Sequence, residues 1–383
     1  MKNILILHNS LDYNQSGVER VSFLLKNEFC RRDYNCFEGC IKGENTTHQQ
    51  DVFEYNFNDS RKKVLANFLT YIQKHNIDII IIQGLFDPNI NYAISYLKKK
   101  CICKIIFCLH NAPSALNRKK KLSLLNRLKI LIWYFVKFQL VIFDFRNHRI
   151  NMLGKMYDIA DKFILLSNAY LEEFCNIVKR PDVGKISCIN NPLTFQSQQL
   201  NVIPKEKKVL ILGRLDDFQK NISSTLRIWK KIEDSGIYDW NLAIVGSGKD
   251  EIKLKNYAKS INIKNYTFLG ATSEPEKNYN ESALFMMTSR FEGWPMTLLE
   301  AQQCGCIPVA FNTFAALPEI IENGVNGYVV EKDDELSFAK TLIDLMKDES
   351  LRQKLAQNCI NKCQSYSSKA IGDKWDSLLK KLI

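Results

Sequence analysis

The sequence lacks several features that would assign it to common protein classes. No apolar run approaches the ~18 residues that a membrane-spanning helix needs, so we expect no transmembrane segment. The 12 cysteines include no Cys-x2-Cys pair, and no histidine cluster lies near them, which argues against a zinc site. The sequence contains no Asp-x-Asp triplet, internal repeat or low-complexity tract. Its start, MKNILILHNS, has an apolar run too short for a signal peptide and predicts a buried strand.

Length and charge narrow the remaining classes. A chain of 383 residues exceeds one ordinary domain, so we expect two domains of roughly 150 to 200 residues. The formal net charge of +12 favours an anionic partner, such as nucleic acid, an anionic membrane or an anionic ligand. No RNA- or DNA-binding motif is visible, so we expect no nucleic-acid partner. Cysteines without a disulfide or metal pattern predict reduced core residues in a cytoplasmic protein.

Short apolar runs recur along the chain, with segments of helical periodicity between them. Fully apolar strands indicate parallel sheets that helices cover on both faces, so the fold class is α/β. A polar stretch at 193–206 separates the two halves. Ligands in such folds bind beyond the carboxyl ends of the strands. The predicted strands cover residues 3–8, 78–84, 104–110 and 161–167 in the first half, and 208–214, 241–248, 266–270, 283–289 and 306–312 in the second.

The most informative segment is SRFEGWPMTLLEAQQCGCIP, residues 289–308. Glu292 and Glu300 stand eight positions apart, and a Gly-Trp-Pro break lies between them. An apolar strand candidate precedes the pair, so the segment predicts a strand, a loop and then a helix. A surface helix with a glutamate in its second turn is the alternative for such a spacing, but the break and the strand favour a binding site.

The predicted helix start has the properties of an anion site. Pro295 suits the first helical position, because its missing N–H would be unpaired there. A helix N-terminus carries partial positive charge and can hold a phosphate. Glu300, about one turn inside, can accept hydrogen bonds from a diol such as a ribose, and Glu292 can meet hydroxyls beyond the phosphate. The amides predicted to hold the phosphate are those of Met296, Thr297 and Leu298.

The run Glu292-Gly293-Trp294-Pro295 with Glu300-Ala301 resembles the Glu-x7-Glu signature of the family-four retaining glycosyltransferases, also called group 1. The resemblance implies the GT-B fold, in which two doubly wound Rossmann-like domains face a central cleft. It implies an acceptor-binding domain at 1–195, a nucleotide-sugar-binding domain at 206–366, and a terminal helix at 367–383 that packs back on the first domain. It also implies that Glu300 binds the ribose and that Glu292, with Gly293, lies near the donor sugar.

Two cations follow another predicted strand. Gly213-Arg214-Leu215 ends the strand, and Lys220-Asn221 comes after a short loop. Charge builds on a leaving diphosphate as a glycosidic bond breaks, and preplaced Arg and Lys side chains stabilise that charge. Solvated loop cations are the alternative. The pattern resembles the diphosphate motif of the family, which implies that role for Gly213, Arg214 and Lys220. Since no Asp-x-Asp triplet is present, we predict turnover that needs no metal and no cofactor.

Four further residues enter through their position and the resemblance. Gly246 and Gly248 close a strand, where we expect them to let the backbone approach the nucleotide. Gly17 opens a helix at the place where related enzymes have a Gly-rich loop near the donor phosphate; a plain helix cap is the alternative. His110 ends another strand, and the resemblance implies that it hydrogen-bonds the donor sugar or the developing charge. A rim histidine without a catalytic role is the alternative there.

Residues 118–149 combine basic, aromatic and helical-period apolar residues. We interpret them as a helix pair that lies on an anionic membrane surface, with a core helix carrying solvated charges as the alternative. The position, just after His110 in the acceptor domain, is where the family presents a membrane-docking surface. This interpretation implies a peripheral protein on the inner face of the plasma membrane, with a lipid-linked acceptor.

Together these features predict a retaining hexosyltransferase. It would move a hexose or N-acetylhexosamine from a nucleotide-sugar, with UDP the expected nucleotide, to a lipid-linked, lipopolysaccharide or capsular glycan. The leaving phosphate would take the acceptor proton, so no protein nucleophile is needed. Alternatives on the same fold are a nucleotide-sugar epimerase, a sugar phosphorylase and a non-catalytic nucleotide-sugar binder. A nucleic-acid-binding protein is suggested only by net charge.

Overall fold

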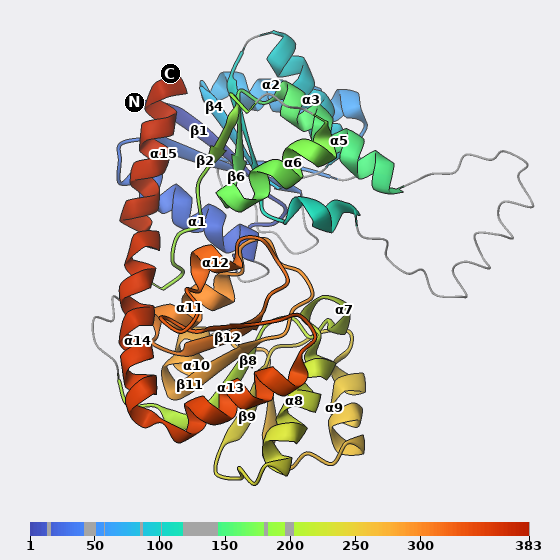
Figure 1. Cartoon of the computed structure of the whole chain (residues 1–383). Coiled ribbons are helices and arrows are strands. Elements are labelled where there is room, and N and C mark those ends of the chain that lie inside the picture. Colours follow the sequence, from blue (N-terminus) through green and yellow to red (C-terminus); the bar gives the residue numbers. More distant parts are fainter. Residues whose placement is uncertain are drawn as a thin grey trace, which may run out of the picture.

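The computed structural model describes residues 1–13, 17–41, 51–56, 58–84, 87–100, 102–117, 145–179, 183–195 and 203–382. These residues form two α/β domains, one above the other in Figure 1. Most of the predicted basic segment at 118–149 lies outside the described residues: 118–144 are not described, and neither are the side chains of 145–149.

The first domain is built on a seven-stranded sheet in the order β3-β2-β1-β4-β5-β6-β7, with every neighbouring pair parallel. Its strands are β1 (Asn3–Leu7), β2 (Asn35–Ile41), β3 (Val52–Tyr55), β4 (Ile79–Gln83), β5 (Lys104–Leu109), β6 (Lys162–Leu165) and β7 (Ile186–Cys188). Its helices include α1 (Gly17–Cys30), α2 (Arg61–Lys74), α3 (Pro88–Lys99), η1 (Pro113–Asn117), α5 (Phe145–Ile159), η2 (Asn168–Tyr170) and α6 (Leu171–Val178).

The second domain repeats this plan on a six-stranded parallel sheet in the order β10-β9-β8-β11-β12-β13. Its strands are β8 (Glu206–Leu212), β9 (Asn241–Val245), β10 (Tyr266–Gly270), β11 (Ser282–Met287), β12 (Ile307–Phe311) and β13 (Tyr328–Val330). Its helices are α7 (Asp217–Lys220), α8 (Ile222–Asp234), α9 (Glu251–Ser260), α10 (Pro275–Glu281), α11 (Met296–Gln303), α12 (Leu317–Ile320), α13 (Glu335–Lys347) and α14 (Glu349–Cys363).

Burial explains why the central strands were visible in the sequence. All five residues of β4 and all six of β11 are buried, as expected for strands that helices cover on both faces. Each of the nine predicted strands is present to within a few residues. The α/β prediction, with two doubly wound parallel sheets, is therefore confirmed.

Sequence analysis missed four strands, β2, β3, β7 and β13. Three of them have only three or four residues, and β2 has the sequence NCFEGCI, with a glutamate inside the strand. That residue, Glu38, is 3% exposed, and its carboxylate accepts hydrogen bonds from Lys26 and Tyr13. Burial opposes the charge, but the contacts with His8 and Lys26 outweigh it and lower the pKa of Glu38 to about 2. Glu38 interrupts the apolar pattern of β2 because it is charged. The partners that allow its burial lie elsewhere in the chain, so the sequence pattern alone does not indicate a strand here.

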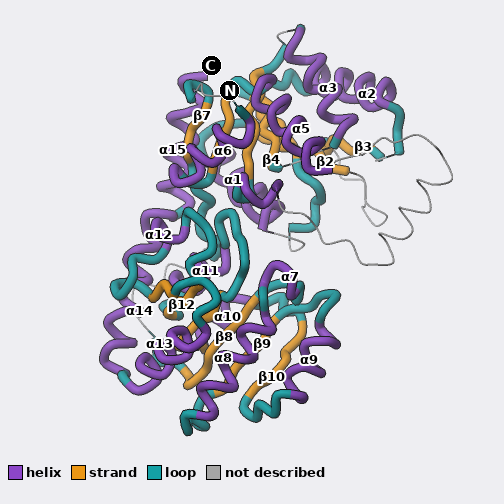
Figure 2. The backbone as a smooth tube through the Cα atoms, turned by 45° about the vertical axis from the view of Figure 1, so that its right-hand side comes forward, coloured by secondary structure: helices purple, strands orange, loops and turns teal. Residues whose placement is uncertain are grey.

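The chain crosses between the domains twice, and the crossings touch. The first follows Leu193, the second follows α14, and Leu193 N donates to Tyr366 O at 2.9 Å. After η3 (Gln364–Tyr366), helix α15 (Ser368–Leu382) runs along the first domain, beside α1 (Figures 1 and 2). Trp375 packs edge-on against Phe29 with ring centroids 5.7 Å apart. The end of the chain thus packs against the first domain.

Candidate active site

The segment with the two glutamates forms the loop and helix that follow β11. Helix α11 begins at Met296, and Pro295 is its N-cap with extended backbone angles, φ −69° and ψ 109°. The prediction that Pro295 occupies the first helical position is therefore wrong by one residue. Leu298 N donates to Pro295 O at 3.1 Å. One of the three amides predicted to hold a phosphate, that of Leu298, is therefore already bonded within the chain.

Glu292 is hydrogen-bonded to Lys220, one of the residues predicted to bind the diphosphate. Its Oε1 accepts a hydrogen bond from Lys220 Nζ at 2.7 Å, and only 8% of its side chain is exposed. Gln219 Nε2 lies 3.4 Å from Glu292 Oε2, and Gln219 Oε1 accepts from Arg214 Nη2 at 3.0 Å. The structure thus links Arg214, Lys220 and Glu292 in one polar network, a connection that sequence analysis did not make.

The same cations border a small pocket at the carboxyl ends of β8 and β11. Gly213, Arg214, Lys220 and Thr297 contribute to its lining. A Cβ built on Gly213 would lie 3.7 Å from Lys220 Cε, which places the lysine stem over this glycine. Two cations and the first turn of α11 therefore meet at one place, where an anionic group would be stabilised from several sides.

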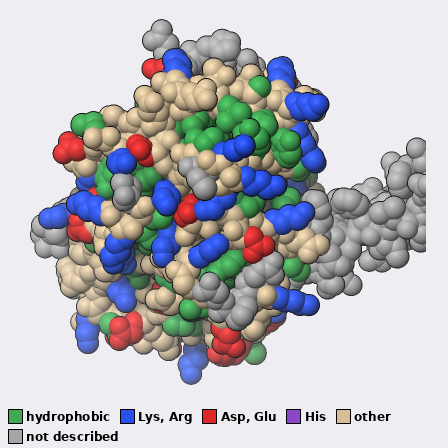
Figure 3. Space-filling model, turned by 90° about the horizontal axis from the view of Figure 1, so that it is seen from above, with side chains coloured by type: hydrophobic (Ala, Val, Ile, Leu, Met, Phe, Trp, Pro, Cys, Tyr) green, Lys and Arg blue, Asp and Glu red, His purple; other side chains and the backbone are tan. Residues whose placement is uncertain are grey.

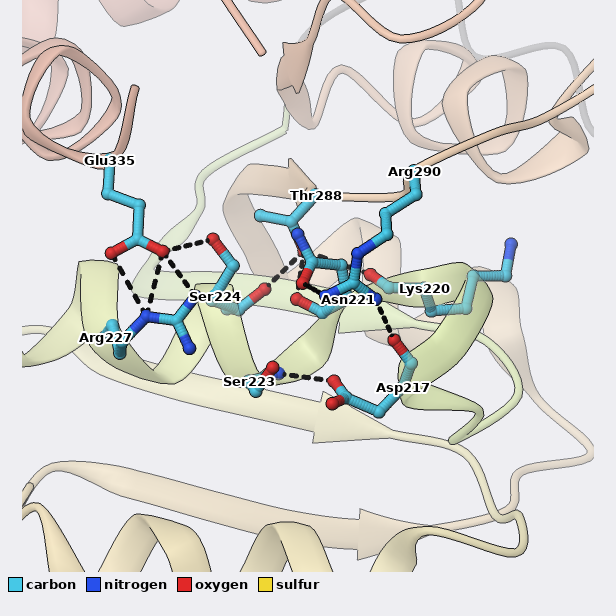
Figure 4. Close-up of polar contacts among 10 residues, drawn as sticks. Asp217, Lys220, Asn221, Ser223, Ser224, Arg227, Thr288, Arg290 and Glu335 are labelled. Carbon is cyan, nitrogen blue, oxygen red and sulfur yellow. Dashed lines mark hydrogen bonds and ion pairs between the residues drawn. The ribbon is translucent and has the colours of Figure 1, made fainter. Parts of the chain in front are cut away.

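A second group of residues holds Lys220 in place (Figure 4). Asn221 breaks the chain between α7 and α8 in the left-handed conformation, φ 54° and ψ 40°. Thr288 Oγ1 donates to the carbonyl oxygens of Lys220 and Asn221, each at 3.1 Å. Arg290, from the loop that carries Glu292, donates through its guanidinium to Asn221 Oδ1 and to Asp217 O. Sequence analysis missed Thr288 and Arg290, although both stand directly before the Glu292 motif.

The start of α8 is anchored to the rest of the domain on its other side. Asp217 Oδ1 accepts from Ser223 N at 2.7 Å. Glu335, at the start of α13, accepts from Ser224 Oγ at 2.8 Å and from Arg227 Nη2 at 2.6 Å (Figure 4). These bonds fix the turn that carries Lys220 from both ends.

Gly246 and Gly248 serve loop packing. A Cβ on Gly246 would stand 1.9 Å from Gly213 O, and one on Gly248 would stand 2.5 Å from Leu215 O. Leu215 N donates to Ser247 O at 2.8 Å, so the two loops lie backbone against backbone. The close approach that these glycines permit in the structure is thus to the loop of Gly213 and Arg214.

Glu300 lies one turn inside α11 and is 3% exposed. Its Oε1 accepts from Thr194 Oγ1 at 2.8 Å and from Arg20 Nη1 at 3.3 Å. Its Oε2 accepts from Tyr279 OH at 3.0 Å. Arg20 belongs to the first domain, so the predicted ribose ligand is held from both domains. None of these three partners was predicted, because each lies far from Glu300 in sequence.

The first domain meets this site through two predicted residues. Gly17 begins α1, and a Cβ built on it would lie 3.6 Å from Met296 Cγ, so the N-terminal ends of α1 and α11 face each other. A Cβ on Gly293 would lie 2.2 Å from His110 O, which makes glycine necessary at this contact. Tyr170 OH donates to Gly293 O at 2.6 Å and adds a second link between the domains.

His110 is held in an uncharged state. Its Nε2 lies 2.6 Å from Gln83 Oε1, and burial lowers the pKa of His110 to about 4. Near neutral pH a neutral imidazole can exchange a hydrogen bond with a sugar hydroxyl but carries no charge to offer a phosphate. Both roles that we predicted for His110, a hydrogen bond to the donor sugar or to the developing charge, stay predictions.

The fold matches solved structures over its whole length. The structure of Anabaena Alr3699/HepE in complex with UDP-glucose superimposes with a TM-score of 0.72, at 15% identity over 100% of both chains. These neighbours have the GT-B architecture, and so does this chain.

Residues 194–362 match the sequence profile of the family "Glycosyl transferases group 1". The resemblance seen in the sequence is therefore confirmed for the part of the chain that the profile covers. It is 30% identical to the amylovoran biosynthesis glycosyltransferase AmsD of Erwinia amylovora over 227 residues, which are 58% of this chain and 63% of that relative's length. It is 23% identical to the GalNAc-α-(1→4)-GalNAc-α-(1→3)-diNAcBac-PP-undecaprenol α-1,4-N-acetyl-D-galactosaminyltransferase of Campylobacter jejuni, over 96% of this chain and 95% of that one.

Proposed function

We propose that this protein is a retaining hexosyltransferase that uses a nucleotide-sugar, with UDP as the nucleotide, to extend a bacterial surface glycan. The observation that carries the proposal is the meeting of Arg214, Lys220 and the first turn of α11 around one pocket, with Glu292 bonded to Lys220. The named relatives support the acceptor class, since one serves amylovoran biosynthesis and another acts on an undecaprenol-diphosphate glycan. The neighbour that holds UDP-glucose supports the donor class.

In this proposal the protein stabilises charge and positions the reactants. The bond between the sugar C1 and the phosphate oxygen breaks, and negative charge develops on the departing diphosphate. Arg214 and Lys220 face that charge. The acceptor hydroxyl attacks C1 from the same side and passes its proton to the leaving phosphate oxygen, so the configuration is retained. Lys220 has three N–H donors and uses one on Glu292, which leaves two for phosphate oxygens.

A glycosyl-transfer assay tests the proposal and its alternatives. Purified protein would be incubated with UDP- and GDP-sugars, with and without a lipid-linked glycan acceptor. We expect donor consumption to require the acceptor and to release UDP, and NMR of the product to show the donor's anomeric configuration. An epimerase would convert the donor without acceptor, a phosphorylase would require inorganic phosphate, and an inverted product would contradict the proposal.

Substitutions at Glu300 and at Arg214 should have different effects, one on donor binding and the other on turnover. We expect Glu300→Ala to raise the KM for the donor, because it removes the ribose ligand, and Arg214→Ala to lower kcat, because it removes charge at the leaving group. Wild-type kinetics in the Arg214 variant would contradict its role.

We also propose that the acceptor is reached at an anionic membrane surface through the basic segment at 118–149, which lies mostly outside the described residues. No helix in the described part of the chain is long and apolar enough to cross a bilayer. Figure 3 shows a face of the first domain where Lys and Arg side chains outnumber Asp and Glu, with apolar side chains between them. Co-sedimentation with vesicles of phosphatidylcholine, with and without phosphatidylglycerol, tests this idea. Binding should require the anionic lipid and weaken with salt.

A further inference from the structure

Glu300 lies where four separate parts of the chain meet. The carboxylate belongs to α11, and its three donors come from the first turn of α1, the crossing that leaves the first domain, and α10. The crossing is itself fastened along α11, since Gln303 Nε2 donates to Phe195 O at 2.6 Å. The position of the carboxylate therefore depends on how the two domains sit together.

The three bonds leave the carboxylate little freedom. A carboxylate offers about four lone-pair directions, two on each oxygen. Arg20 and Thr194 share Oε1, and Tyr279 takes one direction of Oε2. Burial and the charge of Glu300 raise the pKa of Tyr279 well above its ordinary value, so its hydroxyl keeps the proton that it donates. Rotation about the last side-chain bond would break at least two of these bonds.

Of the three donors, only Arg20 is charged. It belongs to the first domain, whereas Glu300 belongs to the second. Its side chain is 27% exposed, whereas Glu300 is 3% exposed, so Arg20 reaches the buried carboxylate from the rim. A pocket opens beside this contact, and Arg20, Thr194 and Ser273 contribute to its lining together with Phe195 and Pro275. Arg20 thus borders both the carboxylate and an open pocket.

We propose that Arg20 is a positioning residue for the donor ribose: by holding Glu300 from the first domain, it sets the direction in which the carboxylate accepts a ribose hydroxyl. This inference rests on the proposed function, in which Glu300 binds the ribose. It adds that recognition of the ribose by this glutamate of the second domain requires a residue of the first domain as well. The effect of Arg20 is exerted through Glu300, without contact with the reacting atoms.

The test compares nucleotides that differ by one hydroxyl. Dissociation constants for UDP, 2′-deoxy-UDP and 3′-deoxy-UDP would be measured by calorimetry on the full chain. For the wild type we expect at least one deoxynucleotide to bind about tenfold more weakly than UDP, because it lacks a hydrogen bond to a charged group. In Arg20→Gln we expect this preference to fall below about threefold, mainly through weaker binding of UDP.

Two further variants complete the test. Arg31→Gln makes the same chemical change just after the same helix, at a residue that is 65% exposed and 3.5 Å from Glu28, and should keep the wild-type preference. Thr194→Val removes the 2.8 Å bond to the same oxygen with little change of shape, and it should lower the preference even if Arg20→Gln folds poorly. A full wild-type preference in a folded Arg20→Gln or Thr194→Val protein would overturn the inference and leave the proposed function intact. Absence of UDP binding by the wild type would instead overturn the UDP-dependent function, and the inference with it.

Discussion

Lys220 and Glu292 form an ion pair of 2.7 Å that joins the end of α7 to the loop after β11. Both side chains are largely buried, with 20% and 8% of their surfaces exposed. A buried ion pair stabilises a fold weakly, but the loss of one partner leaves the other charge uncompensated. The pair therefore ties Lys220, the cation that we propose faces the leaving group, to the loop that carries Glu292.

Lys220→Gln should lower kcat by a factor of about 100 to 1,000, the usual cost of one lost donor to developing charge. It should also lower the melting temperature, because Glu292 stays buried without a cation. The double variant Lys220→Gln with Glu292→Gln should recover part of that stability but none of the activity, as kinetics and calorimetry would show. Lys207→Gln, which removes an exposed pair with Asp239, is the matched control and should change neither. Recovery of activity in the double variant would contradict the role of Lys220.

Asn221 should be replaceable by glycine more readily than by alanine. Its φ of 54° costs glycine nothing but strains alanine, and both substitutions remove the bond from Arg290. We expect Asn221→Ala to be less stable than Asn221→Gly by about 1 kcal/mol, as urea unfolding would measure. Both variants should lower kcat, because Lys220 loses its anchored neighbour. Equal stability of the two variants would show that backbone strain is unimportant at this turn.

Gly246→Ala should destabilise the protein by about 3 kcal/mol, since overpacking and strain at a special backbone position each cost 1 to 3 kcal/mol. The added Cβ would fall 1.9 Å from Gly213 O, and backbone atoms cannot yield as a flexible side chain does. Gly154→Ala, in α5, is the control, because a Cβ there meets no atom within 4 Å. That change should be neutral or stabilising by up to about 1 kcal/mol. Unfolding curves that coincide for Gly246→Ala and the wild type would refute the packing argument.

His110 predicts a pH dependence of stability. Burial lowers the pKa of His110 to about 4, against ~6.5 for an exposed imidazole. The unfolded chain therefore binds the proton more tightly, and the stability contributed by His110 is complete above about pH 6.5 and is lost as the pH falls toward 4. The difference in unfolding free energy between the wild type and His110→Gln should shrink by about 3 kcal/mol across that window.

The pH range in which His110 affects stability differs from that of Glu38. The pKa of Glu38 lies at about 2, so its contribution is lost only at lower pH, where an exposed carboxyl would already be protonated. Urea unfolding at half-unit steps between pH 6.5 and 4.5 would isolate the histidine. Curves for wild type and His110→Gln that run parallel in this range would show that the imidazole is not perturbed.

Chelation should leave activity unchanged. Arg214 and Lys220 supply positive charge beside the proposed phosphate pocket, and the helix start adds partial charge, so we expect that charge stabilisation requires no divalent cation. Initial rates after dialysis against EDTA, with and without added magnesium or manganese, would check this. A loss of activity with EDTA that manganese restores would disprove metal-independent turnover.

The sequence predicted the central strands and the family, but it did not reveal how the site residues are connected. Unbroken apolar runs predict strands such as β4 and β11, and the residues of the Glu292 to Glu300 motif lie close together in the sequence. The partners of Glu300 are 280, 106 and 21 positions away, and no periodicity links such residues. Arg20 lies three positions after Gly17, which was a predicted site residue, but only the meeting of the domains shows what Arg20 contacts.

The contact between Leu193 and Tyr366 has a mechanical consequence. The two crossings of the chain between the domains are hydrogen-bonded to each other at this point. A rotation of one domain relative to the other would therefore have its axis near this contact. Thr194, the next residue, is bonded to Glu300, so that carboxylate lies near the axis and moves least. If the domains opened, the parts of the interface farthest from this contact would separate most, and the surroundings of Glu300, where we propose that the ribose binds, would separate least.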